Sequence, residues 1–106
     1  MQIREEFLVF ENTNTPLTYE IDTLSSDLLK IQIVGTGDCL IEISAKLTSS
    51  EDYSAVAIID DKTYDMLDSI VTSGLYSVPI TGYKKVKLSV KSVVNTLKCT
   101  AAEVDE

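Results

Sequence analysis

The last third of the chain alternates apolar and polar residues between glycines. The apolar and glycine positions that carry this pattern are Gly74, Tyr76, Val78, Ile80, Gly82, Tyr83, Val86, Leu88 and Val90. A period of two residues sends successive side chains to opposite faces of an extended strand, and it is typical of antiparallel strands that are buried on one face. The pattern therefore predicts a chain built mainly from β-strands.

The remainder of the chain has the same organisation of short strands separated by turn residues. The segments expected as strands are 7–10, 17–24, 28–34, 39–48, 55–59, 76–80, 83–90 and 93–104. No change of composition marks a linker, and 106 residues is a usual length for one domain. About eight strands therefore predict a single all-β domain, 1–106, folded as an antiparallel β-sandwich of the immunoglobulin-like or jelly-roll type.

A glycine-rich turn separates two of these strands. We expect Gly35-Thr36-Gly37-Asp38 to form a tight hairpin that pairs 28–34 with 39–48. The residues of the second strand that should face the core are Cys39, Ile41, Ile43, Ala45 and Leu47. The next segment, 49–54, is expected to be an exposed loop.

Several positions depart from simple alternation. The segment 55–59 is apolar throughout, which predicts a strand covered on both sides or covered by another subunit. We expect 60–73 to be a loop with at most one turn of helix. Pro79 cannot donate to a ladder, so its strand should lie at a sheet edge or contain a bulge. Gly74 and Gly82 should adopt backbone conformations that other residues rarely enter.

Charge argues against nucleic acid or a membrane as the partner. The net charge is −8, so a phosphate backbone or an anionic lipid surface would be repelled. The distribution is uneven, because residues 1–82 carry 4 basic and 14 acidic side chains, residues 83–98 carry 5 basic and no acidic ones, and residues 99–106 carry 3 acidic ones. A basic segment thus lies between two acidic ones.

The start of the chain lacks the pattern of a secretory signal. Two acids, Glu5 and Glu6, precede an apolar run of only four residues, and the other apolar runs are too short to span a bilayer. We therefore expect synthesis in a cytoplasm. In that setting Cys39 and Cys99, which each share a strand face with aliphatic residues, should be buried free thiols rather than a disulfide.

The residues offer little for catalysis or metal binding. The chain has no histidine, which removes the commonest general base and metal ligand, and two thiols alone do not make a metal site. Asp60, Asp61, Asp65 and Asp68 crowd one segment, but their spacing is not that of a calcium loop. We interpret them as a solvated acidic loop, with an enzyme that uses paired acids as an alternative, and we expect no cofactor.

Five residues are candidates for an interaction surface. Lys85, Lys87 and Lys91 share one strand face, which is either a solvated surface that deters edge pairing or a basic face that meets an acidic face of the next copy. Tyr53 and Tyr64 lie in expected loops, where a ring can stack on a sugar, fill a partner's pocket or fold back onto the core.

The segment from Ser69 to Val86 resembles a recurrent stretch of small virion proteins of tailed bacteriophages. It contains a Gly-x-Tyr-x-Val strand, a glycine turn at Gly82 and the beginning of a second alternating strand. Thr15-Pro16-Leu17 and the segment from Gly35 to Leu47 resemble the same proteins. The resemblance implies a β-sandwich structural component of a phage or prophage particle, of the head-fibre, decoration, neck or tail-associated type.

Such a protein would work by assembling with copies of itself and with other virion proteins, without catalysing a reaction, and would be located in the virion. The alternative from another functional class is a carbohydrate-binding β-sandwich module, which needs exposed aromatic side chains on one face or loop rim.

Overall fold

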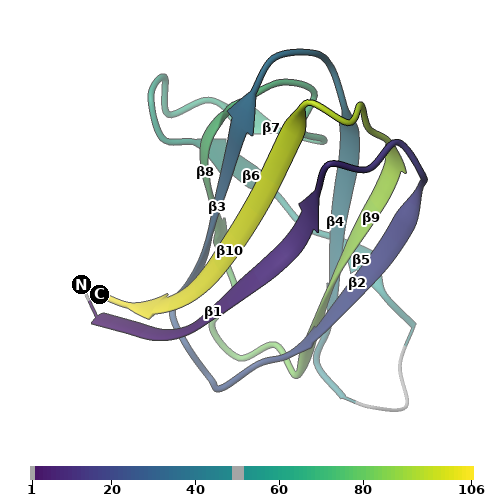
Figure 1. Ribbon diagram of the computed structural model, residues 1–106. Helices are drawn as coiled ribbons and strands as arrows, with labels where there is room; N and C mark the ends of the chain where they lie inside the picture. Colours follow the sequence, from purple (N-terminus) through teal and green to yellow (C-terminus); the bar gives the residue numbers. More distant parts are fainter. Residues whose placement is uncertain (1, 49–51) are drawn as a thin grey trace.

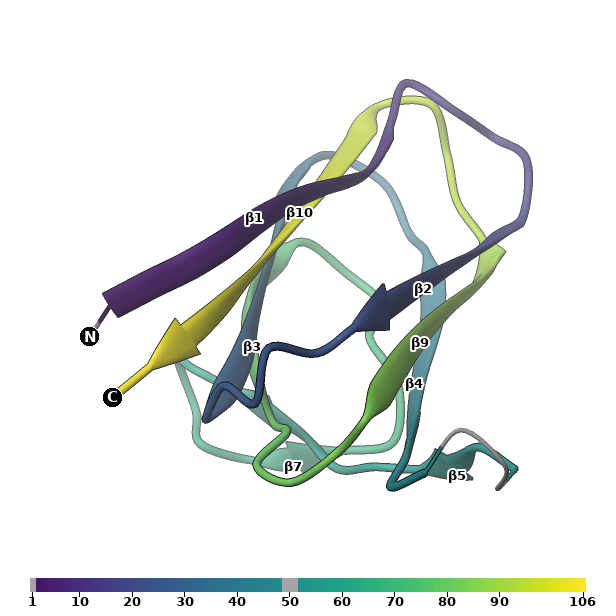
Figure 2. The same cartoon turned by 90° about the horizontal axis from the view of Figure 1, so that it is seen from below.

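The computed structural model describes residues 2–48 and 52–106, which form two antiparallel sheets packed face to face (Figures 1 and 2). The six-stranded sheet has the order β1 (Gln2–Glu11), β10 (Leu97–Asp105), β3 (Leu28–Gly35), β8 (Gly74–Pro79), β6 (Ile58–Asp60) and β7 (Met66–Leu67). The four-stranded sheet has the order β2 (Leu17–Asp22), β9 (Lys85–Ser92), β4 (Leu40–Lys46) and β5 (Ser54–Ala55). The predicted all-β sandwich is confirmed. Among the described residues, no helix is long and apolar enough to cross a membrane.

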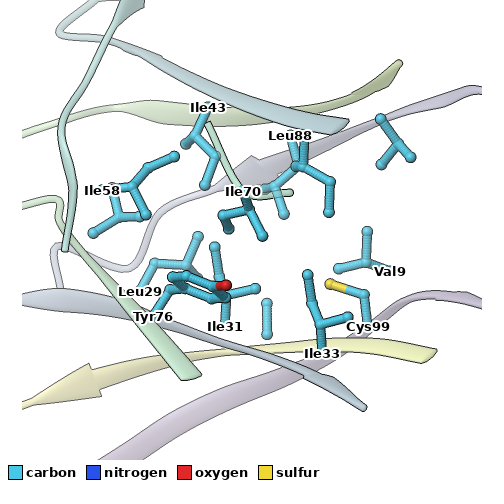
Figure 3. Packing of buried hydrophobic residues seen from close by; sticks show 14 of the residues in the cluster. Val9, Leu29, Ile31, Ile33, Ile43, Ile58, Ile70, Tyr76, Leu88 and Cys99 are labelled. Carbon is cyan, nitrogen blue, oxygen red and sulfur yellow. The ribbon is translucent and has the colours of Figure 1, made fainter. Parts of the chain in front are cut away.

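The core lies between the two sheets and is almost entirely aliphatic. Figure 3 shows Ile31, Ile33 and Cys99 of the six-stranded sheet facing Leu88 of the four-stranded one, with Ile70 between them. Alternate residues of β3 and β9 are buried, as the period of two predicts. Cys39 and Cys99 are both buried and free, which agrees with the expectation of inward-facing thiols.

The prediction of a hairpin at 35–38 is wrong. β3 belongs to the six-stranded sheet and pairs with β10 and β8, whereas β4 belongs to the four-stranded sheet and pairs with β9 and β5. The turn therefore carries the chain from one sheet to the other. Gly35 is needed there because its φ is +120° and a Cβ atom would overlap the carbonyl oxygen of Thr96 in the β9–β10 connection.

The inward phase predicted for the strand after this turn is correct except at its end. Cys39, Ile41, Ile43 and Ala45 are buried. Leu47 is 57% exposed, because β4 ends at Lys46 and the chain leaves the sheet before Leu47.

The apolar segment 55–59 is not a single covered strand. Its first residue belongs to β5, which pairs with β4, and its last two belong to β6 in the other sheet. The chain crosses between the sheets inside this segment, so Ile58 is the residue of the segment that becomes fully buried. Of the loop expected at 49–54, residues 49–51 lie outside the described residues, and Ser54 is part of β5.

The strand β8 is not an edge strand, because β3 and β6 flank it. Ile80 donates its N–H to the carbonyl of Asp27 on the β3 side, so Pro79, one residue earlier, faces the β6 side. The pairing with β6 reaches only Ser77, and the missing N–H of Pro79 therefore costs no ladder bond.

The segment around β8 otherwise follows the sequence pattern. Gly74 and Gly82 have φ values of +155° and +87°, as expected for these two glycines. Asp60 ends β6, and residues 61–73 form a loop that holds the short strand β7 and no helix.

Candidate interaction site

The three candidate lysines of β9 lie on the outer face of the four-stranded sheet, opposite the buried residues Val86, Leu88 and Val90. Lys85 Nζ lies 3.2 Å from Asp22 Oδ1, and Lys91 Nζ lies 3.4 Å from Glu42 Oε1. The hydrogen bond that the Lys85 ammonium donates to Asp22 raises the pKa of Lys85. Because β9 runs between β2 and β4, the basic strand meets acidic side chains of its own chain on both sides.

Lys87 is engaged differently, because its ammonium lies 4.4 Å from the centre of the Tyr53 ring. Lys46 approaches the same ring at 4.7 Å, and the Tyr53 hydroxyl donates to Glu20 Oε1 across 3.2 Å. Partial burial and the nearby Glu20 raise the pKa of Tyr53. Tyr53 lies in the loop before β5, as predicted, and its ring is held over the sheet by side chains from β2, β4 and β9.

A groove runs along the outer face of β2 and β9, beside these lysines. It encloses about 460 Å³ and is lined by Pro16, Leu17, Thr18, Lys87, Ser89, Val90 and Lys91. Thr18 and Ser89 are register partners, and their side chains are shorter than those of Lys87 and Lys91. They therefore form the floor of the groove between the two lysines. We call this surface the β2–β9 groove. It offers two ammonium groups, two hydroxyl groups and the ring of Pro16, because the side chains of Leu17 and Val90 face the core.

Tyr64 lies at the other end of the structure, in the turn of the β6–β7 hairpin. It is 80% exposed, and Met66 beside it is 74% exposed. The turn is tightly bonded: Tyr64 N–H donates to the carbonyl of Asp60 across 2.7 Å, and Asp60 Oδ1 accepts from the N–H of Lys62 across 2.8 Å. Tyr64 has a φ of +62°, which is unusual for a bulky residue. The hairpin therefore presents an aromatic ring from a defined backbone.

The four clustered aspartates have separate roles. Asp60 closes the turn, whereas Asp61 Oδ2 lies 3.0 Å from Lys30 Nζ and Asp61 Oδ1 accepts a hydrogen bond of 2.5 Å from Ser77. Lys30 also donates to the Ser77 hydroxyl across 2.8 Å. These three side chains fasten the hairpin to β3 and β8. Asp65 and Asp68 are exposed.

A second groove, of about 430 Å³, lies on the outer face of the six-stranded sheet. Its lining residues are Glu6, Phe7, Leu8, Lys30, Gln32, Leu75, Thr100, Ala101 and Ala102. The side chains of Thr100 and Ala102 on β10 are shorter than that of Leu8 on the adjacent strand β1 and that of Leu75 on β8, beyond β3, which accounts for the hollow. Tyr53 and Tyr64 belong to the lining of neither groove.

Some of these residues were not singled out by the sequence. Met66, Thr18 and Ser89 are ordinary residues for a turn or an outer strand face, and they acquire meaning only through register and position. Glu103 could have been recognised from the sequence as an acidic residue at a buried position, because it shares the inward phase of Cys99 and Ala101. It is fully buried, and its Oε1 accepts a hydrogen bond from the N–H of Leu24 across 2.9 Å.

The fold is found in other proteins, although no protein-family model and no curated protein sequence matches this chain. The SPBc2 prophage-derived protein YomS is 19% identical, with a TM-score of 0.80 over 93% of this chain and 90% of that protein. The PBSX exported protein XepA is 14% identical, with a TM-score of 0.81 over 93% of this chain but only 37% of XepA, so the chain spans little more than a third of that protein. The chain shares the β-sandwich fold of these two phage-derived proteins, which confirms the resemblance at the level of the fold.

Proposed function

We propose that the chain is a non-enzymatic structural or assembly protein of a phage or prophage particle, which acts through self-association or by docking on the particle. The observation that carries this proposal is the shared fold. It extends over 93% of this chain and 90% of the prophage-derived YomS. On this account the protein is made in the host cytoplasm and ends in the virion.

The surface supports a docking role. The Tyr64 ring and the Met66 side chain project into solvent from a turn that several hydrogen bonds hold in place. Aromatic and methionine side chains are enriched where proteins bind one another, and a preorganised backbone lowers the entropy that binding costs. Neither side chain packs in the core, so both are available to a partner.

A carbohydrate-binding module is the alternative. Such a module stacks an aromatic ring on a sugar above a polar groove, and Tyr53 or Tyr64 would supply the ring. The Tyr53 ring is already contacted by Lys46 and Lys87, and neither tyrosine lines a described groove. These positions favour assembly over sugar binding.

The direct test is the composition of the particle. Particles produced by the phage or induced prophage that encodes this chain would be purified on a density gradient and analysed by quantitative mass spectrometry. We expect the chain at a fixed ratio to the head or tail proteins, and we expect it to stay with the particles through a second gradient.

A glycan array with the purified protein tests the alternative, a carbohydrate-binding module. Absence from the particles, together with binding of a defined sugar that is lost in Tyr64→Ala, would replace the proposal by the carbohydrate-binding module. Binding lost in Tyr53→Ala would have the same meaning.

A further inference from the structure

We propose that the β6–β7 hairpin of one copy docks into the β2–β9 groove of the next copy. The inference rests on the proposed self-association and names the two surfaces that carry it. The hairpin contributes the ring of Tyr64, the side chain of Met66 and the exposed carboxylates of Asp65 and Asp68. The groove contributes Lys87, Lys91 and the hydroxyl floor of Thr18 and Ser89.

The opposite charges of the hairpin and the β2–β9 groove favour this contact. Two lysines and no carboxylate line the groove, whereas residues 60–68 hold four aspartates and one lysine. Asp60 and Asp61 are engaged within their own copy, in the turn and with Lys30, so Asp65 and Asp68 are the carboxylates directed to a partner. Opposite charges brought together at an interface steer the encounter and fix its register.

The shape of the groove suits an aromatic side chain. Lys87 and Lys91 are four residues apart on one strand, or about 13 Å along it, with the short Ser89 midway. A ring placed on Ser89 and Thr18 would lie between two ammonium groups and beside Pro16. Lys87 already contacts one ring in this way, that of Tyr53, so the lysines of this face accept an aromatic neighbour.

The contact that Lys91 makes within its own copy is weak. The pair between Lys91 and Glu42 is half exposed on both sides, at 56% and 54%, and exposed ion pairs contribute little free energy. Lys91 can therefore exchange Glu42 for a carboxylate of the hairpin at small cost.

The groove on the six-stranded sheet fits the hairpin less well. Its lining includes the carboxylate of Glu6, and its lysine, Lys30, is bound to Asp61 and Ser77 of the same copy. Glu6 would repel the acidic hairpin there, and Lys30 is not free to offset that repulsion.

The two surfaces lie on opposite sides of the sandwich. β7 is an edge strand of one sheet and β2 is an edge strand of the other, and Figure 2 shows them far apart. Because the contact joins two different surfaces on opposite sides of the sandwich, it runs head to tail. Such a contact produces a ring if the rotation between copies closes and a filament if it does not.

The test uses one variant for each surface. Ser89→Tyr fills the groove from an exposed strand face, where an aromatic residue suits the strand. Tyr64→Asn removes the ring and keeps a residue that tolerates the positive φ. Sedimentation velocity should show that each variant alone associates at least about tenfold more weakly than the wild type.

Mixing the two variants is the decisive step. The hairpin of Ser89→Tyr and the groove of Tyr64→Asn are intact, so the mixture should form a one-to-one complex and nothing larger. Charge exchange gives a second test: Lys91→Glu should weaken association, and adding Asp65→Lys and Asp68→Lys to it should restore association. Lys84→Glu makes the same charge change outside the groove, and Leu8→Asn alters the other groove, so both should associate as the wild type does.

The outcomes are separable. If the wild type assembles and Ser89→Tyr and Tyr64→Asn assemble equally well, or if their mixture remains monomeric, this interface is wrong while self-association stands. Loss of assembly in Leu8→Asn but not in Ser89→Tyr would move the contact to the other groove. A wild type that is monomeric at every concentration would overturn the interface together with self-association, and docking on the particle would be judged by the particle analysis.

Discussion

The ammonium of Lys87 lies 4.4 Å from the centre of the Tyr53 ring, and this contact joins β9 to the residue that precedes β5. Lys46 approaches the same ring, and Glu20 accepts a hydrogen bond from its hydroxyl. Tyr53 thereby ties together three strands of the four-stranded sheet.

Tyr53→Ala should lower the free energy of unfolding by about 1 kcal/mol, because contacts between a cation and an exposed ring contribute roughly 0.5–1 kcal/mol. Tyr53→Phe keeps the ring and loses only a hydrogen bond to an exposed carboxylate, so its cost should be a few tenths of that. Urea denaturation measures both values. Equal losses in the two variants would show that the hydroxyl, not the ring, is the stabilising group.

Asp61→Ala should destabilise the protein by about 1–3 kcal/mol, because it leaves Lys30 and Ser77 partly buried without their carboxylate. The matched control is Asp68→Ala, which removes an exposed carboxylate from the same loop and should cost less than about 0.5 kcal/mol. Chemical denaturation of the two variants gives the comparison. A control that loses as much as Asp61→Ala would mean that the whole acidic loop contributes, rather than the cluster with Lys30.

The buried thiol of Cys99 should make stability fall at alkaline pH. Burial raises the pKa of Cys99 to about 12, from a usual value near 9 in the unfolded chain. Above pH 9 the unfolded thiol loses its proton while the folded one keeps it, so ionisation favours the unfolded state until about pH 12. The stabilisation by the protonated, buried thiol is fully present below pH 9. Between pH 9 and pH 12 the free energy of unfolding should fall by about 1.4 kcal/mol per pH unit.

Urea titrations of the wild type and of Cys99→Ala at several pH values measure this slope. The variant is expected to be less stable at neutral pH, because a buried sulfur is removed, and to lose less stability as the pH rises. Parallel pH profiles for the two proteins would assign the alkaline loss to other groups.

Two glycines separate the effect of backbone strain from that of steric overlap. Gly82→Ala should cost about 1 kcal/mol, since its φ is positive but a Cβ atom there meets nothing within 4 Å. Gly35→Ala should cost clearly more, because its Cβ atom would also overlap the backbone of the β9–β10 connection. Thermal unfolding of both variants supplies the comparison, and a cost at Gly82 equal to that at Gly35 would contradict it.

Alternation in the sequence was enough to predict the class of fold and the face on which most residues lie. It could not predict which strands pair, because period two specifies a face and not a neighbour. The turn at 35–38 shows this limit: two alternating strands around glycines favoured a hairpin, yet β3 and β4 lie in different sheets. Leu47 shows another, since alternation continues past the residue at which β4 ends.

The candidate site was predictable in the same partial sense. The common face of Lys85, Lys87 and Lys91 followed from their spacing on one strand. Their partners Asp22, Glu42 and Tyr53 did not, because these come from β2, β4 and the segment before β5, whose register against β9 is set by the whole sandwich. The groove likewise depends on Thr18 lying opposite Ser89.

The central claim, that this protein works by assembling, is tested most directly by sedimentation velocity of the wild type over a wide range of concentrations. Runs at roughly 0.05 M and 0.5 M salt would vary the screening of exposed charges. The account predicts species larger than the monomer whose fraction rises with protein concentration and falls at the higher salt. A single monomeric species at every concentration and at both salt levels would contradict it.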